Sequence, residues 1–162
     1  CKIYVTVIRG TPMMVQLMIM GFVIFKSSRN FTMVGVLSLG INSGAYVAEI
    51  VRGGLMSVDV GQSEAGRSLG LGYLDTMRFI VIPQAVKNVL PALGNEFIVL
   101  LKETSVACYI GIADLTKGAQ TIGSVTYDYI VPLLCAAYIY FLMTTTLATG
   151  LNKIERRMRR SD

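Results

Sequence analysis

The sequence contains no histidine, and this absence excludes several kinds of catalytic and metal site. Histidine-based catalytic triads and the zinc motif H-E-x-x-H both need that side chain. The P-loop pattern G-x-x-x-x-G-K-[ST] is also missing, so any ATP that drives this protein must be bound by another chain. Three widely separated cysteines, Cys1, Cys108 and Cys135, show no metal-binding or redox spacing.

Charge is scarce as well. Charged residues make up 15% of the 162 residues, whereas soluble domains average about 25%. Hydrophobic residues make up 53%, and the mean hydropathy of +0.58 favours a membrane protein. The net charge of +5 does not indicate nucleic-acid binding, because five of the fifteen basic residues crowd into the last ten positions. A basic tail after an apolar stretch is typical of a cytoplasmic membrane end.

Long stretches with little or no charge predict membrane-spanning helices, each of which needs about 20 residues. The predicted spans are residues 10–27, 31–51, 82–101 and 129–151. Within the third, Pro91 and Gly94 predict a kink or a broken helix. The sequence therefore predicts an all-α membrane protein, a transmembrane helix bundle that forms a single domain over residues 1–162.

Small residues recur every fourth position in the second predicted span, at Gly40, Gly44 and Ala48. This spacing places them on one helix face, where small side chains allow another helix to approach closely. We expect this face to pack tightly inside the bundle.

Basic residues are unevenly divided between the connections. They are richer in residues 51–87 and in the C-terminal tail than in the other two loops. With four spans, the two richer segments fall on the same side of the membrane. The positive-inside rule then places residues 57–80 and the C-terminus in the cytoplasm.

The connection at residues 57–80 has helix signals of its own. Asp59 is a suitable N-cap, and Gly70 is suited to the left-handed position that ends a helix. A second short helix is predicted to start near Asp75. From these residues alone, two interpretations remain open: an amphipathic helix at the membrane surface, or a helix on which another protein docks.

The spacing of this connection resembles the EAA loop of ABC importer permeases, which follows E-A-A-x3-G-x9-I-x-L-P. The matching positions are Glu64, Ala65, Gly66, Gly70, Ile80 and Pro83. Gly66 stands where the pattern has a second alanine, and Ile82 stands where it has leucine. The resemblance implies that these residues couple the permease to an ATP-binding subunit. Glu64 would anchor the coupling helix, Ala65 and Gly66 would permit close docking, and Gly70 would set the turn.

Other blocks extend the resemblance to the polar amino-acid subfamily and fall in family order. They are RGTPMMVQL (9–17), NSGAYVAEIVRGGLMSVDVGQSEAGRSLG (42–70), IPQAVKNVLPALGNEFIVLLKETSV (82–106) and LNKIERRMRR (151–160). The resemblance implies a multi-pass protein of a bacterial-type cytoplasmic membrane with about five spans, one of which would precede Cys1. It also implies a second permease subunit, identical or homologous, two cytoplasmic ATPase subunits that bind ATP and Mg²⁺, and an external substrate-binding protein.

Ionisable and polar residues within or at the ends of predicted spans are candidates for the substrate path, because such groups are costly in lipid. The candidates are Glu49, Asn95, Glu96, Lys102 and Glu103. A polar amino acid is a zwitterion and needs partners of both charges. A simpler interpretation is that Glu49 pairs with Arg52 along one helix face, and that Lys102 and Glu103 are solvated at the outer boundary.

Three other interpretations of the chain remain open. A secondary transporter driven by an ion gradient would not need the EAA-like loop. A membrane anchor that only recruits a cytoplasmic partner would tolerate changes at Asn95 and Glu96. A truncated gene product would not assemble with partners at all.

Overall fold

The structure of the chain is a computed structural model that describes residues 2–159, and helices joined by short connections make up this range without a strand. The elements are α1 (Lys2–Arg9), α2 (Met13–Ile19), η1 (Met20–Ile24), α3 (Phe31–Met56), α4 (Val60–Ser68), α5 (Tyr73–Thr76), η2 (Met77–Val81), α6 (Ile82–Glu103), η3 (Thr104–Ile110), α7 (Leu115–Thr126) and α8 (Ile130–Arg159). The prediction of an all-α helical bundle is confirmed.

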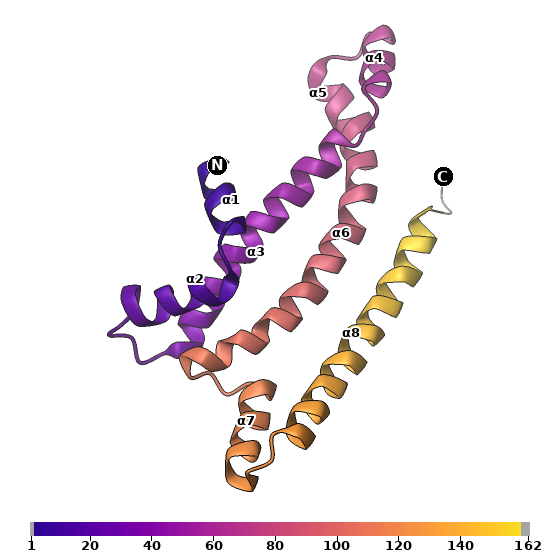
Figure 1. Ribbon diagram of the computed structural model, residues 1–162. Coiled ribbons are helices and arrows are strands. Elements are labelled where there is room, and N and C mark those ends of the chain that lie inside the picture. Colours follow the sequence, from indigo (N-terminus) through magenta and orange to yellow (C-terminus); the bar gives the residue numbers. More distant parts are fainter. Residues whose placement is uncertain (1, 160–162) are drawn as a thin grey trace.

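Three long helices determine the shape of the molecule (Figure 1). Helices α3 and α6 lie side by side and antiparallel, and α8 runs along α6 on the side away from α3. Helices α4 and α5 extend beyond the shared end of α3 and α6, whereas α7 lies at the opposite end. Helix α1 lies against α3.

Among the described helices, Phe31–Met56 and Ile130–Arg156 are long and apolar enough to cross a membrane. The pair Lys2–Arg9 and Met13–Ile24 qualifies only if its two parts form one span, and they are bent by 104°. Helix α6 does not meet the same criteria, so its passage through the membrane stays a prediction.

The bend between α1 and α2 interrupts the start of the first predicted span, residues 10–27. Pro12 precedes α2 and lacks the N–H that a continuous helix would use. The amide nitrogen of Gln16 donates hydrogen bonds to the carbonyl oxygens of Ile8, at 2.6 Å, and Thr11, at 3.0 Å. The side chain of Gln16 thus replaces backbone hydrogen bonds that the bend removes.

Gln16 also connects this bend to α3 through a hydrogen bond. Its side-chain oxygen accepts a hydrogen bond of 2.9 Å from Asn42, which is buried. Close by in the sequence, Leu17 belongs to a small apolar core with Val34 and Ile110. The core therefore joins α2, α3 and η3 at the end of the molecule that lies away from α4.

Of the two alternatives predicted for the third span, the broken helix is wrong, because α6 continues through Pro91 and Gly94, and the kink stays a prediction. Gly94 has a packing role instead. A Cβ atom at this position would lie 2.2 Å from the nearest methyl carbon of Leu151 on α8. Gly54 similarly leaves room on α3 for Val89 of α6, where the corresponding distance is 2.1 Å. Both glycines allow neighbouring helices to approach.

The face of α3 that carries Gly40, Gly44 and Ala48 is exposed in this chain, so the prediction that it packs inside the bundle is wrong for the described residues. Only Gly44 of the two glycines meets another segment, the hydroxyl of Tyr4 on α1. The buried residues of α3 are Val34, Gly35, Ser38, Asn42, Ala45 and Gly54. Side chains from α2, η3 and α6 determine which face of α3 is buried. The spacing of small residues along α3 gives no information about these contacts.

Helix α7 lies in a segment that the sequence analysis treated as a plain loop. Asp114 caps it by accepting a hydrogen bond of 2.7 Å from the backbone N–H of Lys117. This cap is a local signal that could have identified the helix. Tyr127, at φ 54°, ends α7 and turns the chain toward α8.

Candidate coupling segment and substrate path

The segment between α3 and α6 projects from the end of the helix bundle (Figure 1). Asp59 begins α4, and its carboxylate accepts a hydrogen bond of 2.8 Å from the backbone N–H of Gly61. Gly70 ends the turn with φ +81°. The N–H of Gly70 donates to the carbonyl of Arg67, and that of Leu71 donates to the carbonyl of Gly66. These two bonds form a Schellman motif, so the predicted helix start and stop are both confirmed.

The second short helix begins at Tyr73, two residues before the predicted position near Asp75. It does not stand alone, because α5, the π-helical turn η2 and α6 follow one another without a gap from Tyr73 to Glu103. The segment that carries α4 is therefore attached directly to the long helix α6.

Gly66 faces the chain itself. It is the buried residue of α4, and a Cβ atom there would lie 2.9 Å from the terminal carbon of Ile80 and 3.1 Å from the side chain of Thr76. Glu64 and Ala65 are exposed. The sequence predicts the same docking role for Ala65 and Gly66, but only Ala65 lies on the outer surface. Ile80 serves as the inner support of Gly66, and Pro83 occupies the first turn of α6.

The outer surface of this projection combines charge with exposed apolar side chains. The Glu64 carboxylate has no hydrogen-bond or ion-pair partner within the described part of the chain. Leu69 is 80% exposed and Leu74 is 79% exposed. Tyr73 is also exposed beside them in the sequence. We call these four residues, together with Ala65, the tip surface.

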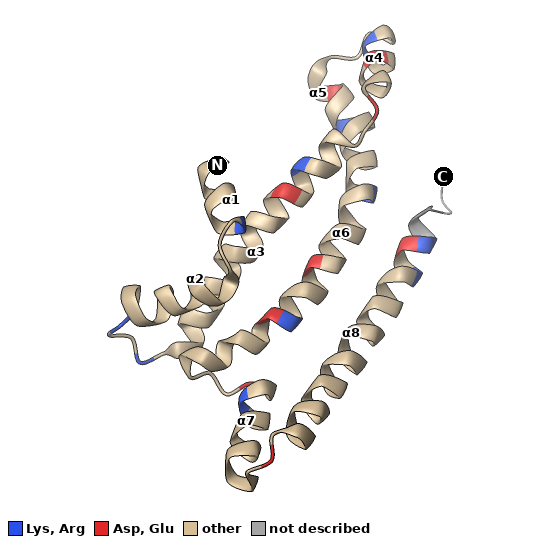
Figure 2. Ribbon diagram, viewed as in Figure 1, with Lys and Arg blue, Asp and Glu red and all other residues tan. Residues whose placement is uncertain are grey.

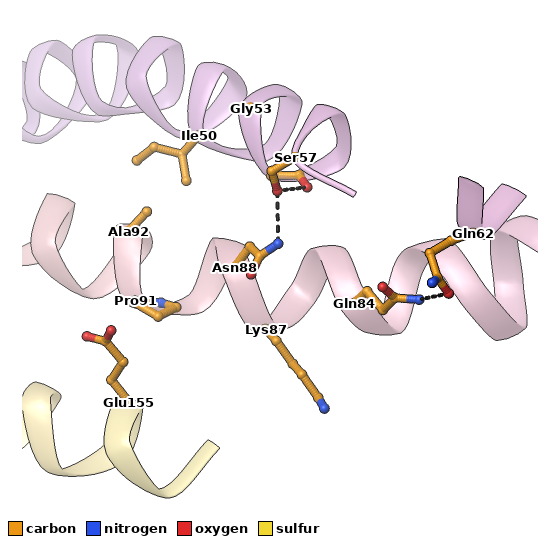
Figure 3. Close-up of a pocket in the computed structure, with 11 residues that line it drawn as sticks. Ile50, Gly53, Ser57, Gln62, Gln84, Lys87, Asn88, Pro91, Ala92 and Glu155 are labelled. Atoms are coloured by element: carbon orange, nitrogen blue, oxygen red, sulfur yellow. Dashed lines mark hydrogen bonds between the residues drawn. The ribbon is translucent and has the colours of Figure 1, made fainter. Parts of the chain in front are cut away.

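Two side-chain hydrogen bonds fasten the projection to the bundle (Figure 3). Gln84 of α6 donates to Gln62 of α4 at 3.1 Å, and Asn88 of α6 donates to Ser57 at 2.9 Å. No sequence motif points to these four residues. Their pairing depends on the antiparallel approach of α3 and α6, which no local pattern encodes.

The candidate path residues of α6 are only partly brought together. Ser43 of α3 donates a hydrogen bond of 3.4 Å to the half-buried Glu96. Glu103 lies seven residues farther on and thus on nearly the same helix face. Asn95 and Lys102 are exposed. Glu96 is therefore the candidate that lies at the contact between α3 and α6.

Glu49 belongs to a separate charged group. It accepts hydrogen bonds from Arg52, as the spacing predicts, and its second oxygen lies 3.7 Å from Arg9 of α1. The Arg9 guanidinium also lies over the ring of Tyr46, 5.2 Å from its centroid. The contribution of Arg9 was missed because it depends on the bend after α1.

Charged side chains are distributed unevenly along the helices (Figure 2). They mark α3, α6 and the projection, whereas most of α8 carries none until its last turns. Many apolar side chains of α8 are exposed, including Leu134, Tyr138 and Phe141. This exposed apolar surface suits contact with lipid or with other membrane helices.

Comparison with known proteins identifies the family. Residues 2–160 match the family model described as "Binding-protein-dependent transport system inner membrane component". The arginine transport system permease protein ArtQ of Bacillus subtilis is 39% identical over 98% of this chain and 74% of its own length. The glutamine transport system permease protein GlnP of Escherichia coli K12 is 39% identical over 97% of this chain and 74% of its own length.

A solved structure supports the same assignment. A crystal structure of an amino acid ABC transporter with histidines contains a chain that is 52% identical and superposes with a TM-score of 0.90. The superposition covers 96% of this chain and 74% of that one. The chain therefore belongs to the binding-protein-dependent transport system inner membrane components, the permease subunits of ATP-driven ABC importers.

Proposed function

We propose that this chain forms the translocation path of an importer for polar amino acids, and that the projection at residues 57–80 is the element on which a cytoplasmic ATPase acts. The named substrates of its relatives, arginine and glutamine, belong to this substrate class. The chain is a transport component, and ATP and Mg²⁺ would be bound by the ATPase subunits. A second permease subunit and an external substrate-binding protein would complete the importer.

The observation that carries the proposal is the division of α4 into an inner and an outer side. Gly66 seats the helix on Ile80 and Thr76, while Glu64 and Ala65 face outward. Exposed leucines at the end of a protein are energetically unfavourable in water, and they favour a protein partner. The tip surface thus offers an apolar area with one unpaired carboxylate, which suits a cationic or hydrogen-bonding group on the partner.

The same contacts would transmit a movement of α4 to α6. A push or pull on α4 would reach α6 through Gly66 and Ile80, because η2 continues into α6 without a break. Gln62 and Gln84 provide a second link between α4 and α6. Movement of α6 against α3 would then alter the surroundings of Glu96.

Substrate recognition in this proposal falls on the polar groups between α3 and α6. Glu96 would hold the ammonium group of an amino acid, with Asn95 as a neighbouring hydrogen-bonding group. Lys102 and Glu103 would act nearer the end of α6. Glu49 is already engaged by Arg52 and Arg9, so we assign it to the support of α1 against α3.

The proposal also sets the orientation. The projection and the C-terminal end of α8 would both lie in the cytoplasm, where the basic tail satisfies the positive-inside rule. Residues 26–30 and α7 would lie on the external side, at the opposite end of the long helices.

Purification of the full-length permease from its source membrane in mild detergent tests the coupling role. We expect an ATPase subunit to co-purify, and Glu64→Ala to reduce the retained ATPase or its stimulation by substrate. Ser124→Ala, on the remote helix α7, is the matched control and should retain the ATPase. If no ATPase accompanies the wild-type protein in several mild detergents, the proposal fails and ion-coupled transport becomes the alternative.

A further inference from the structure

A pocket of about 990 Å³ lies between α3, α4, α6 and α8 near the projection. Figure 3 shows its lining residues, among them Ser57 at the end of α3, Asn88 and Pro91 on α6, and Glu155 on α8. Its volume is at the upper end of the range for small-ligand pockets, about 300–1,000 Å³. The pocket is therefore large enough for an amino acid together with water.

The lining residues on α6 continue toward the candidate substrate site. They are Gln84, Lys87, Asn88, Pro91 and Ala92. These positions follow the spacing of three and four residues that defines one helix face. The next positions on the same face are Asn95 and Glu96.

Residues of α3 line the pocket from the opposite side, and their face also continues toward Glu96. Ile50, Gly54 and Ser57 line the pocket. Ser43 lies seven residues before Ile50, on nearly the same face, and it donates the hydrogen bond to Glu96. The pocket and the Glu96 region thus share one interhelical surface. With a rise of 1.5 Å per residue, Asn88 and Glu96 are about 12 Å apart along α6.

The pocket carries partners for both charges of a zwitterion. Lys87 contributes an ammonium group, and Glu155 reaches from α8 toward Pro91 (Figure 3). Both side chains already interact with neighbours, so a ligand would share these groups. Gln84 and Asn88 add amide groups that donate and accept hydrogen bonds.

We propose that this pocket is a second, inner binding site for a zwitterionic amino acid, reached after the Glu96 region and close to the coupling segment. The inference rests on the proposed function, because it assumes that amino acids pass between α3 and α6. The carboxylate would be held near Lys87 and the ammonium group near Glu155. Occupancy would also contact Gln62 on α4, which links this site to the segment on which the ATPase acts.

Protection from chemical labelling tests the site, with the full-length permease and its ATPase reconstituted in nanodiscs. Ala92→Cys places a thiol inside the pocket, and labelling by a water-soluble maleimide is measured above the wild-type background. Arginine and glutamine are the probes, each added at up to 20-fold above the concentration that half-saturates uptake. The matched control is Lys153→Cys, which lies two residues before Glu155 on α8 but outside the pocket lining.

We expect either probe to slow labelling at Ala92→Cys at least threefold and to leave Lys153→Cys unchanged. Protection should persist when Glu96→Gln is added, because the inner site is separate. Lys87→Gln should raise the half-protecting concentration about tenfold, as expected for loss of one charged hydrogen bond. Lys87 is exposed, so Lys87→Gln is expected to fold even if Ala92→Cys does not. In that case, the effect of Lys87→Gln on affinity can be measured by binding of radiolabelled arginine or glutamine.

Three outcomes would overturn the inner site. The first is unchanged labelling in nanodiscs while uptake by the wild-type complex in sealed proteoliposomes with the binding protein is normal, which would leave the proposed function intact. The second is labelling that changes with the phospholipid composition of the nanodisc but not with the probes, which would assign the pocket to a lipid headgroup. The third is absence of both uptake and protection, which would remove the proposed function as well.

Discussion

Gly66 has neighbours on both sides that face away from the bundle, yet its own position is buried. Its importance follows from the short distance to Ile80 and Thr76 and not from a special backbone conformation, since only Gly70 and Gly111 among the described glycines have positive φ. Adjacent positions of the sequence therefore have two different roles. Gly66 packs α4 against the rest of the chain, whereas Glu64 and Ala65 are exposed to a partner.

Substitution of Gly66 by residues of different size tests the seating role. Gly66→Ala requires small movements of the flexible end of Ile80 and of the Thr76 side chain, and the gain in helix propensity, up to about 1 kcal/mol, offsets them. We expect near wild-type thermal stability and ATPase retention. Gly66→Leu should displace α4 from η2 and reduce ATPase retention severalfold in the same co-purification assay. Wild-type retention by Gly66→Leu would contradict the seating role.

Gln16 allows a second prediction at this scale. Gln16→Leu keeps the approximate volume but leaves the buried amide of Asn42 without this partner, and leaves the carbonyl of Ile8 with only the longer hydrogen bond of 3.4 Å from the Thr11 hydroxyl. Each buried polar group that loses its partner costs about 1–3 kcal/mol. We expect a lower midpoint of thermal unfolding in detergent, with Gln120→Leu as the control on α7. Equal midpoints for the two variants would show that Gln16 does not hold the bend.

At the scale of elements, the contact between α6 and α8 depends on the absence of a side chain at Gly94. Leu151 occupies the space that a Cβ atom would need. Close approach of two helices through a small residue is a general feature of membrane bundles. The contact fixes the position of α8 near the inner pocket, because Glu155 lies one turn beyond Leu151.

A compensating pair of substitutions tests this contact. Gly94→Ala alone should destabilise the protein by about 1–3 kcal/mol through overpacking, seen as a lower unfolding midpoint. Addition of Leu151→Ala should recover part of that loss, because it removes the methyl groups that the new Cβ meets. If the effects of the two changes simply add, α6 and α8 are not in contact through these residues.

The elements differ in how far the sequence predicts them. The start and end of α4 were predictable, because Asp59 and Gly70 act through local hydrogen bonds and backbone geometry. The bend after α1 and the exposed small-residue face of α3 were not, since they depend on which distant segments pack there. The broken helix predicted at Pro91 does not occur, because a proline within a helix can be tolerated without a break.

The candidate site shows the same limit. The acidic residues Glu64 and Glu96 could be selected from the sequence alone, by a motif and by cost in the membrane. The side chains that surround Glu64 and Glu96 could not be predicted in this way. The hydrogen bond from Ser43, the pairing of Arg9 with Glu49 and the pocket near Asn88 arise from contacts between residues more than 30 positions apart.

At the scale of the whole molecule, the bundle is incomplete by itself. Much of α8 is exposed and apolar, and the tip surface carries exposed leucines away from the bundle. These surfaces fit a subunit that sits in a membrane and contacts other chains. We propose that ATP hydrolysis on a partner drives transport and that this chain forms the path.

Uptake by sealed proteoliposomes that contain the full-length permease, its ATPase and its substrate-binding protein tests that central claim most directly. Radiolabelled arginine and glutamine are supplied outside with the binding protein, ATP is enclosed on the ATPase side, and ionophores collapse all ion gradients. We expect uptake of at least one of the two amino acids that requires ATP and is lost with Glu64→Ala. Uptake that continues without ATP as long as an ion gradient is held, and that Glu64→Ala does not change, would contradict it.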